Sequence, residues 1–338
     1  MKKKIVYIGN KLAVHGHNPT TIDTLSELFI QEGYPIIAAS SKRNKVFRIL
    51  DMMQTVIKHS RTADFVVIDT YSTANFWYSL IISQLCRVLK IRYIPFLHGG
   101  DLPKRLKRNP HLCRMIFENS YKNVVPSAYL MDQFQKNNIP NLMQIPNFLE
   151  LDQYSFKERK TIKPRLLWVR AFAALYNPKM AVDVAESLKN RYPDVELCMI
   201  GPDKDGSWDE VKKYAALKKV DVRFTGKLTK GEWTALASDY DVFISTSHFD
   251  NMPVSVMEAM ALGLAVVTTN VGGIPFLLEN DVDACLVADN DVAGMVNAIK
   301  IVIESPEKAQ KQIIAAHLKV QKMDWKEIKK QWEVLFED

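Results

Sequence analysis

Two carboxylates, Asp250 and Glu258, stand eight residues apart around the predicted start of a helix. The helix is expected to open at Pro253, because proline has no N–H group to leave without a partner in the first turn. It follows a short apolar strand predicted over 242–244. The first turn of a helix exposes N–H groups and the positive end of the dipole, which favour phosphate oxygens. The N–H groups would donate hydrogen bonds to phosphate oxygens, and the two acids beside them would accept hydrogen bonds from sugar hydroxyls. This combination suits a nucleotide-sugar.

The residues around these acids resemble the Glu-x7-Glu region of glycosyltransferase family 4, through Asp250-Asn251-Met252-Pro253, Glu258-Ala259-Met260-Ala261, Gly263 and Val266-Val267. Members of that family are retaining enzymes with the two-domain GT-B fold. The first acid of the pattern is Asp here rather than Glu, and this shorter side chain bears on the identity of the sugar more than on the reaction.

The resemblance implies a role for each residue of this stretch. Glu258 would hold the ribose of the nucleotide, and Asp250 would bind hydroxyl groups of the sugar. Phosphate or sugar oxygens of the donor would meet the backbone at four residues: Asn251, Met252, Pro253 and Val254.

A cation is also expected beside the leaving diphosphate. Arg170 directly follows a predicted strand, and its counterpart in the family pairs with that diphosphate. The family normally has a lysine five residues further on, where this chain has Leu175. Lys179 or Lys227 could supply the missing charge, and Lys227 follows Gly226 at the end of another predicted strand. The alternative for Arg170 is an ordinary surface arginine.

Two residues of the first half are candidates on the same resemblance. His98 ends a predicted strand beside Gly99 and Gly100, which leave open space over it. Its family counterpart lies near the transferred sugar. Gly16 lies in the turn after the first strand, and its counterpart closes on the donor diphosphate, although glycine is common in such turns for steric reasons.

Strand and helix patterns alternate along both halves of the chain, which predicts parallel, doubly wound sheets with ligands at the carboxyl ends of the strands. The predicted strands cover 4–8, 35–39, 65–69, 92–97, 123–125, 165–169, 196–200, 222–224, 242–244, 265–268 and 284–287. The expected fold class is α/β. Together with the resemblance, it predicts a GT-B architecture of two Rossmann-like domains facing a cleft.

The length of 338 residues suits two domains. Ile145-Pro146-Asn147 resembles the family linker, and the composition then turns polar. We therefore predict an acceptor-side domain over 1–150 and a nucleotide-sugar domain over 151–317. The tail from 310 is expected to be helical, and its part at 318–338 to pack back on the first domain. Its apolar stripe is more often core than a partner site.

Charge is unevenly distributed. Residues 1–160 carry 23 Lys and Arg against 12 Asp and Glu, whereas 161–338 carry 22 against 26. The first half is thus expected to meet something anionic, such as phospholipid headgroups or a pyrophosphate-linked acceptor. The basic clusters are Lys42, Arg43, Lys45 and Arg48, and Lys104, Arg105, Lys107 and Arg108. A solvated charge run is the alternative, and no signature of a nucleic-acid-binding module accompanies the clusters.

Other features limit the function. The four cysteines are scattered without metal-ligand spacing and favour a reducing compartment. Three Asp-x-Asp pairs lie in polar turns, where aspartate is common for local hydrogen bonding. No segment is apolar over the length of a signal peptide or a membrane span. We expect a cytoplasmic location with peripheral contact at the inner face of the membrane, and no metal or cofactor.

The sequence thus predicts a retaining glycosyltransferase that moves a sugar from a nucleoside diphosphate sugar, with a UDP-sugar favoured. The acceptor would be a glycan or a lipid-linked molecule in cell-surface polysaccharide synthesis. Arg170 and the helix start would neutralise the leaving diphosphate. Two alternatives stay open: a sugar-nucleotide epimerase or phosphorylase on the same scaffold, and a non-catalytic module that binds an anionic glycan or a membrane.

Overall fold

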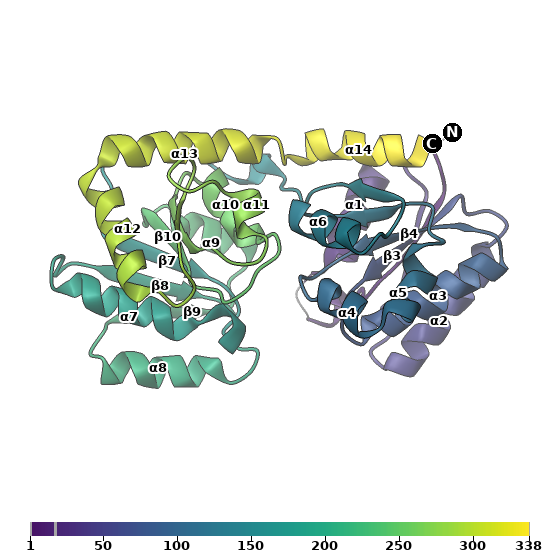
Figure 1. The fold of residues 1–338 in the computed structure, drawn as a ribbon, viewed down its shortest axis with the longest axis horizontal. Coiled ribbons are helices and arrows are strands. Elements are labelled where there is room, and N and C mark those ends of the chain that lie inside the picture. Colours follow the sequence, from purple (N-terminus) through teal and green to yellow (C-terminus); the bar gives the residue numbers. More distant parts are fainter. Residues whose placement is uncertain (1, 17–18, 338) are drawn as a thin grey trace. The chain divides into compact units, whose positions relative to one another are not determined.

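The computed structural model describes residues 2–16 and 19–337, which form two compact units (Figure 1). Unit 1 contains the chain up to Pro146 together with residues from Lys330 onward, and unit 2 runs from Asn147 to Lys329. Within the described residues each unit has a six-stranded sheet whose paired strands run parallel. The predicted α/β class is confirmed.

The sheet of unit 1 has the strand order β2-β1-β3-β4-β5-β6. The strands are β1 (Ile5–Ile8), β2 (Ile36–Ala39), β3 (Phe65–Thr70), β4 (Arg92–Leu97), β5 (Asn123–Val125) and β6 (Leu142–Gln144). The helices are α1 (Thr21–Gln31), α2 (Lys45–His59), α3 (Asn75–Val88), α4 (Leu102–Arg108), α5 (Pro110–Phe117) and α6 (Ala128–Lys136), with a 3-10 turn η1 (Ala13–His15). The central strands β1 and β3 are fully buried, as strands covered on both faces are, and β3 is apolar except for its last two residues, Asp69 and Thr70. β6 was not expected from the sequence.

The sheet of unit 2 has the order β12-β11-β10-β7-β8-β9. Its strands are β7 (Arg165–Val169), β8 (Glu196–Ile200), β9 (Val222–Gly226), β10 (Val242–Ser245), β11 (Ala265–Thr269) and β12 (Cys285–Val287). Its helices are α7 (Pro178–Lys189), α8 (Ser207–Leu217), α9 (Lys230–Ala237), α10 (Val254–Ala261), α11 (Ile274–Leu277), α12 (Val292–Glu304) and α13 (Pro306–Gln321), with η2 (Leu151–Gln153) and η3 (Ala174–Tyr176). Every strand predicted for the second half forms.

Each sheet has one point where the strand order reverses. In unit 1 it lies between β1 and β3, and in unit 2 between β10 and β7. Loops that leave neighbouring strands in opposite directions open a crevice at such a switch point, at the carboxyl ends of the strands. Residues that follow β7 and β10 in unit 2, or β1 and β3 in unit 1, are therefore the ones best placed for a ligand.

The C-terminal tail, which was expected to be helical from residue 310 onward, consists of two helices. α13 ends at Gln321, and α14 (Trp325–Glu337) begins after a short break. The break is held by backbone bonds to the linker: Leu149 N–H donates to the Met323 carbonyl at 2.9 Å, and Trp325 N–H donates to the Leu149 carbonyl at 2.7 Å. The last turns of α14 belong to unit 1, where Trp332 packs edge-on against Phe29.

Among residues 2–16 and 19–337, none of the helices is at once long enough and apolar enough to cross a bilayer.

Candidate functional site

Arg170 and Asp250 meet at the switch point of unit 2. Arg170 follows β7, Asp250 lies in the loop after β10, and the Arg170 Nη2 donates to the Asp250 Oδ2 in a short ion pair. Both side chains are mostly buried. The Nε of Arg170 is also buried and has no hydrogen-bond partner among the described residues. Arg170 therefore has a buried donor left over beside the carboxylate.

Burial changes the protonation equilibrium of Asp250. It raises the pKa of this carboxyl above its usual value, because desolvation outweighs the opposing attraction of Arg170 and the bond from the Asn251 N–H. That N–H donates to the Asp250 Oδ1 at 3.0 Å, while Oδ2 takes the guanidinium. Both carboxylate oxygens thus already have a donor. A sugar hydroxyl would have to share one of them.

Two glycines let a neighbouring loop close on Asp250. A Cβ at Gly273 would lie 1.8 Å from the Asn251 carbonyl oxygen, and one at Gly272 would lie 2.1 Å from the Asp250 carbonyl oxygen. The Gly273 N–H donates to the Asp250 carbonyl at 2.8 Å. Residues 272 and 273 must be glycine because the backbones touch here. The sequence showed a Gly-Gly turn but not what it packs against.

Glu258 lies on α10 and is paired with a tyrosine. The Tyr154 hydroxyl donates to the Glu258 Oε1 at 2.6 Å, and the Lys230 Nζ lies 4.8 Å from the centre of the Tyr154 ring. Burial raises the pKa of Glu258, against the bond from Tyr154 and the charges of Lys230 and Arg170. Burial likewise raises the pKa of Tyr154 well above its usual value. The sequence did not single out Tyr154 or Lys230. A basic residue opening the helix after β9 was the available signal for Lys230.

The first turn of α10 is available to an anion. Pro253 is the N-cap rather than the first helical residue, and no side chain caps the helix. Uncapped helix starts leave N–H groups for water or a ligand. Three serine hydroxyls here are buried without a hydrogen-bond partner in the described part of the chain. They belong to Ser255 in this turn, Ser245 at the end of β10 and Ser247 in the loop that follows. Val254 is exposed, and the Met252 carbonyl accepts a bond from the Asn147 side chain.

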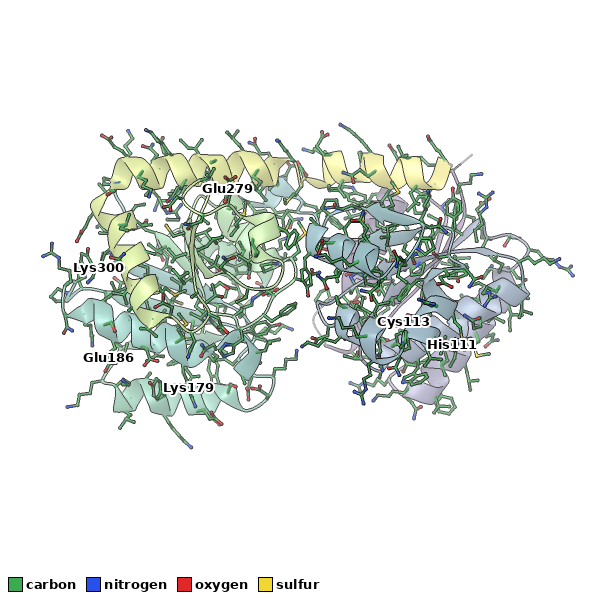
Figure 2. All side chains as sticks on the ribbon, in the orientation of Figure 1. His111, Cys113, Lys179, Glu186, Glu279 and Lys300 are labelled. Carbon is green, nitrogen blue, oxygen red and sulfur yellow. The ribbon has the colours of Figure 1, made fainter. Side chains whose placement is uncertain are left out.

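The lysines considered as replacements for the missing family lysine lie elsewhere. Lys179 is on α7 (Figure 2), where its Nζ pairs with Glu210 at 2.9 Å on the surface. Lys227 is exposed directly after β9, and its role stays a prediction. Leu175, at the family lysine position, lies in η3, and its carbonyl accepts from the His248 N–H at 2.9 Å. Lys230 is the lysine whose charge opposes the raised pKa of Glu258.

In unit 1, His98 is held by a buried acid that the sequence did not single out. The His98 Nε2 lies 2.8 Å from the Asp69 Oδ1, which also accepts from the Tyr7 hydroxyl at 2.9 Å. Tyr71 stacks on the imidazole with ring centres 4.9 Å apart. Asp69 is the penultimate residue of β3 and His98 follows β4, so two adjacent strands bring them together. A Cβ on Gly9, after β1, would lie 2.6 Å from the Asp69 Oδ2.

Gly16 ends the 3-10 turn η1 in a left-handed conformation, with φ of 82°. That conformation explains why a glycine stands here. Its N–H donates to the Ala13 carbonyl at 2.9 Å. The next two residues of the predicted phosphate loop, His17 and Asn18, lie outside the described residues, so the role proposed for Gly16 stays a prediction.

The three Asp-x-Asp pairs have local partners. Asp203 and Asp205 accept bonds from backbone N–H groups of their own turn, and Asp291 caps α12. In the remaining pair Asp281 pairs with Lys308, and Asp283 accepts from the Glu279 N–H. These bonds agree with the interpretation as polar turns.

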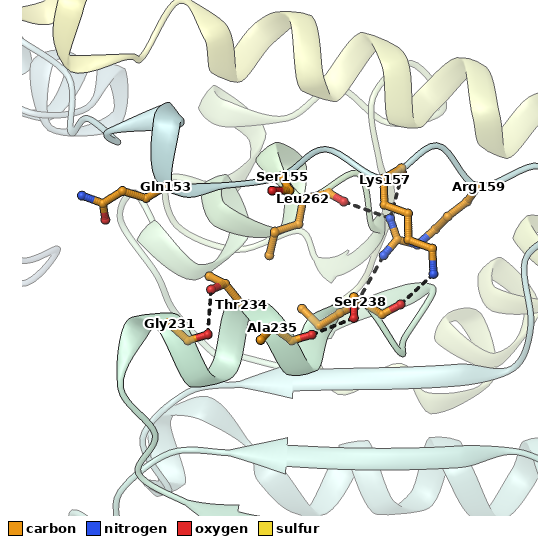
Figure 3. A pocket seen from close by; sticks show the side chains of 10 residues that line it. Gln153, Ser155, Lys157, Arg159, Gly231, Thr234, Ala235, Ser238 and Leu262 are labelled. Carbon is orange, nitrogen blue, oxygen red and sulfur yellow. Dashed lines mark hydrogen bonds between the residues drawn. The ribbon is translucent and has the colours of Figure 1, made fainter.

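A hollow of about 390 Å³ in unit 2 lies away from Arg170 and Asp250 (Figure 3). It lies between the segment 153–159, which follows the linker, and α9, and two cations line it. The Lys157 Nζ donates to the Ser238 carbonyl at 2.7 Å, and Arg159 donates to backbone carbonyls that include those of Tyr240 and Leu262. Because neither Arg170, Asp250 nor the first turn of α10 lines it, the hollow is not the anion site that this turn offers.

Comparison with known proteins matches the family model described as Glycosyl transferases group 1 to residues 152–319. The glycogen synthase of Mycobacterium tuberculosis is 26% identical over 240 residues, which are 68% of this chain and 58% of that protein. The putative colanic acid biosynthesis glycosyltransferase WcaL of Escherichia coli is 25% identical over 229 residues, which are 63% of this chain and 55% of that protein. The match thus spans little more than half of these curated relatives.

Solved structures are similar along almost the whole chain. Sucrose-phosphate synthase from Thermosynechococcus elongatus has a TM-score of 0.84 at 16% identity, covering 99% of this chain and 98% of that one. Anabaena HepE in complex with UDP has a TM-score of 0.80 at 14% identity, covering 99% of both chains. At such identities the likeness concerns the fold, and it confirms the predicted GT-B fold.

Proposed function

This chain belongs, through residues 152–319, to the family Glycosyl transferases group 1, and we propose that it moves a sugar from a nucleoside diphosphate sugar to a glycan or lipid-linked acceptor. The observation that carries the proposal is the gathering of Arg170, Asp250 and the uncapped start of α10 at the switch point of unit 2. A cation and free backbone donors at one point suit a diphosphate.

In the proposed donor site, the first turn of α10 and the guanidinium of Arg170 bind the diphosphate, and Glu258 binds the ribose. As the bond between the anomeric carbon and the diphosphate breaks, negative charge grows on the leaving oxygen. A donor aimed at such charge contributes roughly 2.7–4 kcal/mol of transition-state stabilisation. We propose that these groups do the neutralising, without a metal or a cofactor.

The structure suggests a more specific role for Asp250 than binding sugar hydroxyls alone. Its Oδ2 orients Arg170, and its Oδ1 is bonded to the Asn251 N–H. We propose that Asp250 primarily holds the guanidinium toward the diphosphate. A sugar hydroxyl would then share the carboxylate rather than occupy it alone.

For unit 1 we propose that His98 contacts the transferred sugar, with its ring orientation set by Asp69. The acceptor hydroxyl forms the new bond to the anomeric carbon from the face that the diphosphate leaves, and its proton passes to the departing diphosphate. The configuration is then retained. This stereochemistry rests on the family resemblance stated above.

A UDP-sugar is the donor we favour. Support comes from Anabaena HepE, whose structures contain UDP or UDP-glucose. A relative in Escherichia coli, 24% identical over 172 residues, is named for transfer of galactose from its UDP donor to a diphosphoundecaprenol-linked acceptor. WcaL is named for colanic acid biosynthesis. Together these names support a lipid-linked or polysaccharide acceptor, and with it a place at the inner face of the membrane.

The test is release of nucleoside diphosphate from UDP-glucose, UDP-galactose and GDP-mannose, measured with the wild-type chain and the Glu258→Ala variant. We expect the wild-type chain to release UDP from a UDP-sugar and the Glu258→Ala variant to have lost this activity. Interconversion of sugars without release would favour an epimerase. Binding of the donors without any turnover would favour a non-catalytic module and overturn the proposal.

A further inference from the structure

We propose that the first half of α2 and the segment leading into it form a docking surface for an anionic lipid bilayer. The surface, called here the α2 face, consists of Lys42, Arg43, Lys45, Val46, Phe47 and Leu50. The docking itself does not depend on the reaction, but its purpose rests on the proposed function, since a lipid-linked acceptor lies in a membrane.

The apolar part of the α2 face points to solvent. Val46 and Phe47 are each 64% exposed and Leu50 is 53% exposed, one turn further along the same side. The opposite side of the helix carries the buried Met52 and Val56. Single exposed apolar residues are ordinary, whereas a stripe of them at helical spacing marks an interaction site.

The charge beside this stripe is one-sided. Between Glu32 and Asp64 the chain has six Lys or Arg and a single acid, Asp51. That acid is engaged, because its Oδ2 accepts from the Ser40 hydroxyl at 2.5 Å. Within the described residues no ion pair involves Lys42, Arg43 or Lys45. These cations remain for an anionic partner.

Arg48 fixes the shape of this segment from inside. Its side chain is buried and donates from Nε to the Lys42 carbonyl at 2.7 Å and from Nη2 to the Arg43 carbonyl at 2.9 Å. Asn44 then caps α2 by accepting from the Val46 N–H at 2.8 Å. The backbone is thus held by bonds of its own. The side chains of Lys42 and Arg43 are exposed.

The α2 face lies at the edge of the sheet that carries the unit 1 candidates. The segment before α2 leaves β2 at its carboxyl end, and His98 follows β4 at the same edge because the strands are parallel. The His15 Nε2 lies 2.7 Å from the Ser41 carbonyl, so the loop after β1 contacts this segment. A bilayer docked here would bring a lipid-linked acceptor to the edge where His98 lies.

A membrane fits this surface better than a soluble polyanion. Cations alone suffice for an anionic polymer, whereas a bilayer also takes apolar side chains below its headgroups. The α2 face offers both kinds within one turn of helix. A hollow of about 450 Å³ beside the stripe gives a headgroup room. Its lining includes Lys42, Arg43, Phe47 and Leu50, and also Asp51, whose carboxylate is bonded to Ser40.

The test is co-sedimentation of the chain with vesicles of phosphatidylcholine alone and of phosphatidylcholine mixed with phosphatidylglycerol. We expect binding to the mixed vesicles only, weakened by salt. Phe47→Ser/Leu50→Ser should lower the affinity about ten-fold or more, since each side chain contributes apolar burial. Lys42→Glu/Lys45→Glu should lower it about five-fold or more per charge.

Matched controls lie at the opposite edge of unit 1. Val88→Ser removes a side chain that is 79% exposed at the end of α3, and Arg61→Glu/Lys90→Glu makes the same change of net charge. Both should leave binding unchanged. Absence of binding to mixed vesicles would overturn the proposal, as would charge dependence without any effect of Phe47→Ser/Leu50→Ser. Donor turnover without vesicles is measured separately, so failure of the docking and failure of the proposed function are distinguishable.

Discussion

At the scale of single residues, the candidate site in unit 2 is a set of ionisable groups removed from water. Asp250 and Glu258 both have a raised pKa because burial penalises their charged forms. A hydrogen-bond partner opposes the effect of burial at each acid, Arg170 at Asp250 and Tyr154 at Glu258. Buried acids with raised pKa values and specific partners are typical of functional sites, where stability is given up for chemistry.

Arg170→Ala tests the proposed leaving-group role. We expect loss of donor turnover by about 10²–10³-fold, the effect of removing one donor to developing charge. The fold should survive, because Asp250 can take up a proton once its partner is gone. Steady-state kinetics with the best UDP-sugar measures the loss. Arg191→Ala, a surface residue that contacts Glu304, is the control. Equal rates for the two variants would remove Arg170 from the mechanism.

Glu258→Gln gives a pH-dependent prediction for stability. The folded-state pKa of Glu258 lies above its ordinary value of 4.5, so the folded protein binds this proton more readily than the unfolded chain. The resulting stabilisation is present below pH 4.5 and is lost as the pH rises through the folded pKa. Gln can still accept from Tyr154. We therefore expect the variant to melt higher than wild type at pH 7, with little difference near pH 4.

Thermal unfolding followed by circular dichroism across this range measures the difference. Glu27→Gln, at an exposed position in the middle of α1, is the matched control and should melt like wild type at every pH. A melting difference for Glu258→Gln that is constant with pH would contradict the explanation by burial.

At the scale of elements, the site is positioned by two loops whose backbones are in contact. The loop after β10 carries Asp250, and the Gly272-Gly273 turn after β11 packs against it. Because β10 and β11 are adjacent and in register, the two loops leave the sheet side by side. The start of α10 is therefore placed by a neighbouring strand as well as by its own sequence.

Gly273→Ala tests this packing. The new methyl group would lie 1.8 Å from the Asn251 carbonyl oxygen, so the Asp250 loop has to move. We expect turnover to fall at least about 10²-fold, the effect of a displacement of about 1 Å on positioned groups. Gly231→Ala, in α9 with open space around it, is the control and should stabilise the helix by up to about 1 kcal/mol. Unchanged turnover in Gly273→Ala would show that the loop position is unimportant.

At the scale of the whole molecule, each of the two units packs its own core from the residues that the structure describes. The last turns of α14 complete the first core, where Trp332 lies with ring centres 5.3 Å from both Phe29 and Phe96. The core of unit 2 is built around β7, β10 and β11. Units with separate cores can unfold in separate transitions, and a ligand stabilises the one that binds it.

Calorimetry can assign the transitions. Trp332→Ala should lower the free energy of unfolding of unit 1 by about 3–5 kcal/mol, the usual effect of truncating a buried aromatic side chain. UDP at about 100 times its Kd should raise the free energy of unfolding of unit 2 by about 2.7 kcal/mol. Val334→Ala, exposed on the same helix, should change neither. If UDP instead raised the temperature of the transition that Trp332→Ala lowers, the nucleotide would bind unit 1, which contradicts the proposed donor site.

The sequence alone determined the features that neighbouring residues carry. Strand and helix periodicity predicted the α/β class and most strands. The spacing of Asp250 and Glu258, with Pro253 between them, predicted the helix start, although Pro253 caps α10 rather than opening it. These features were predictable because the interactions that produce them span only a few residues.

Only the tertiary structure decided which side chains meet. Arg170 and Asp250 are 80 residues apart, Tyr154 and Glu258 are 104 apart, and Asp69 and His98 are 29 apart. Arg170 meets Asp250, and Asp69 meets His98, because the order of strands in each sheet brings their carboxyl ends together. No local pattern encodes that order. Tyr154 instead reaches Glu258 on α10 from the segment that follows η2. Asp250, Glu258, Arg170 and His98 were therefore visible in the sequence as candidates. The pairing of Arg170 with Asp250 was not, and neither were the partners Tyr154 and Asp69.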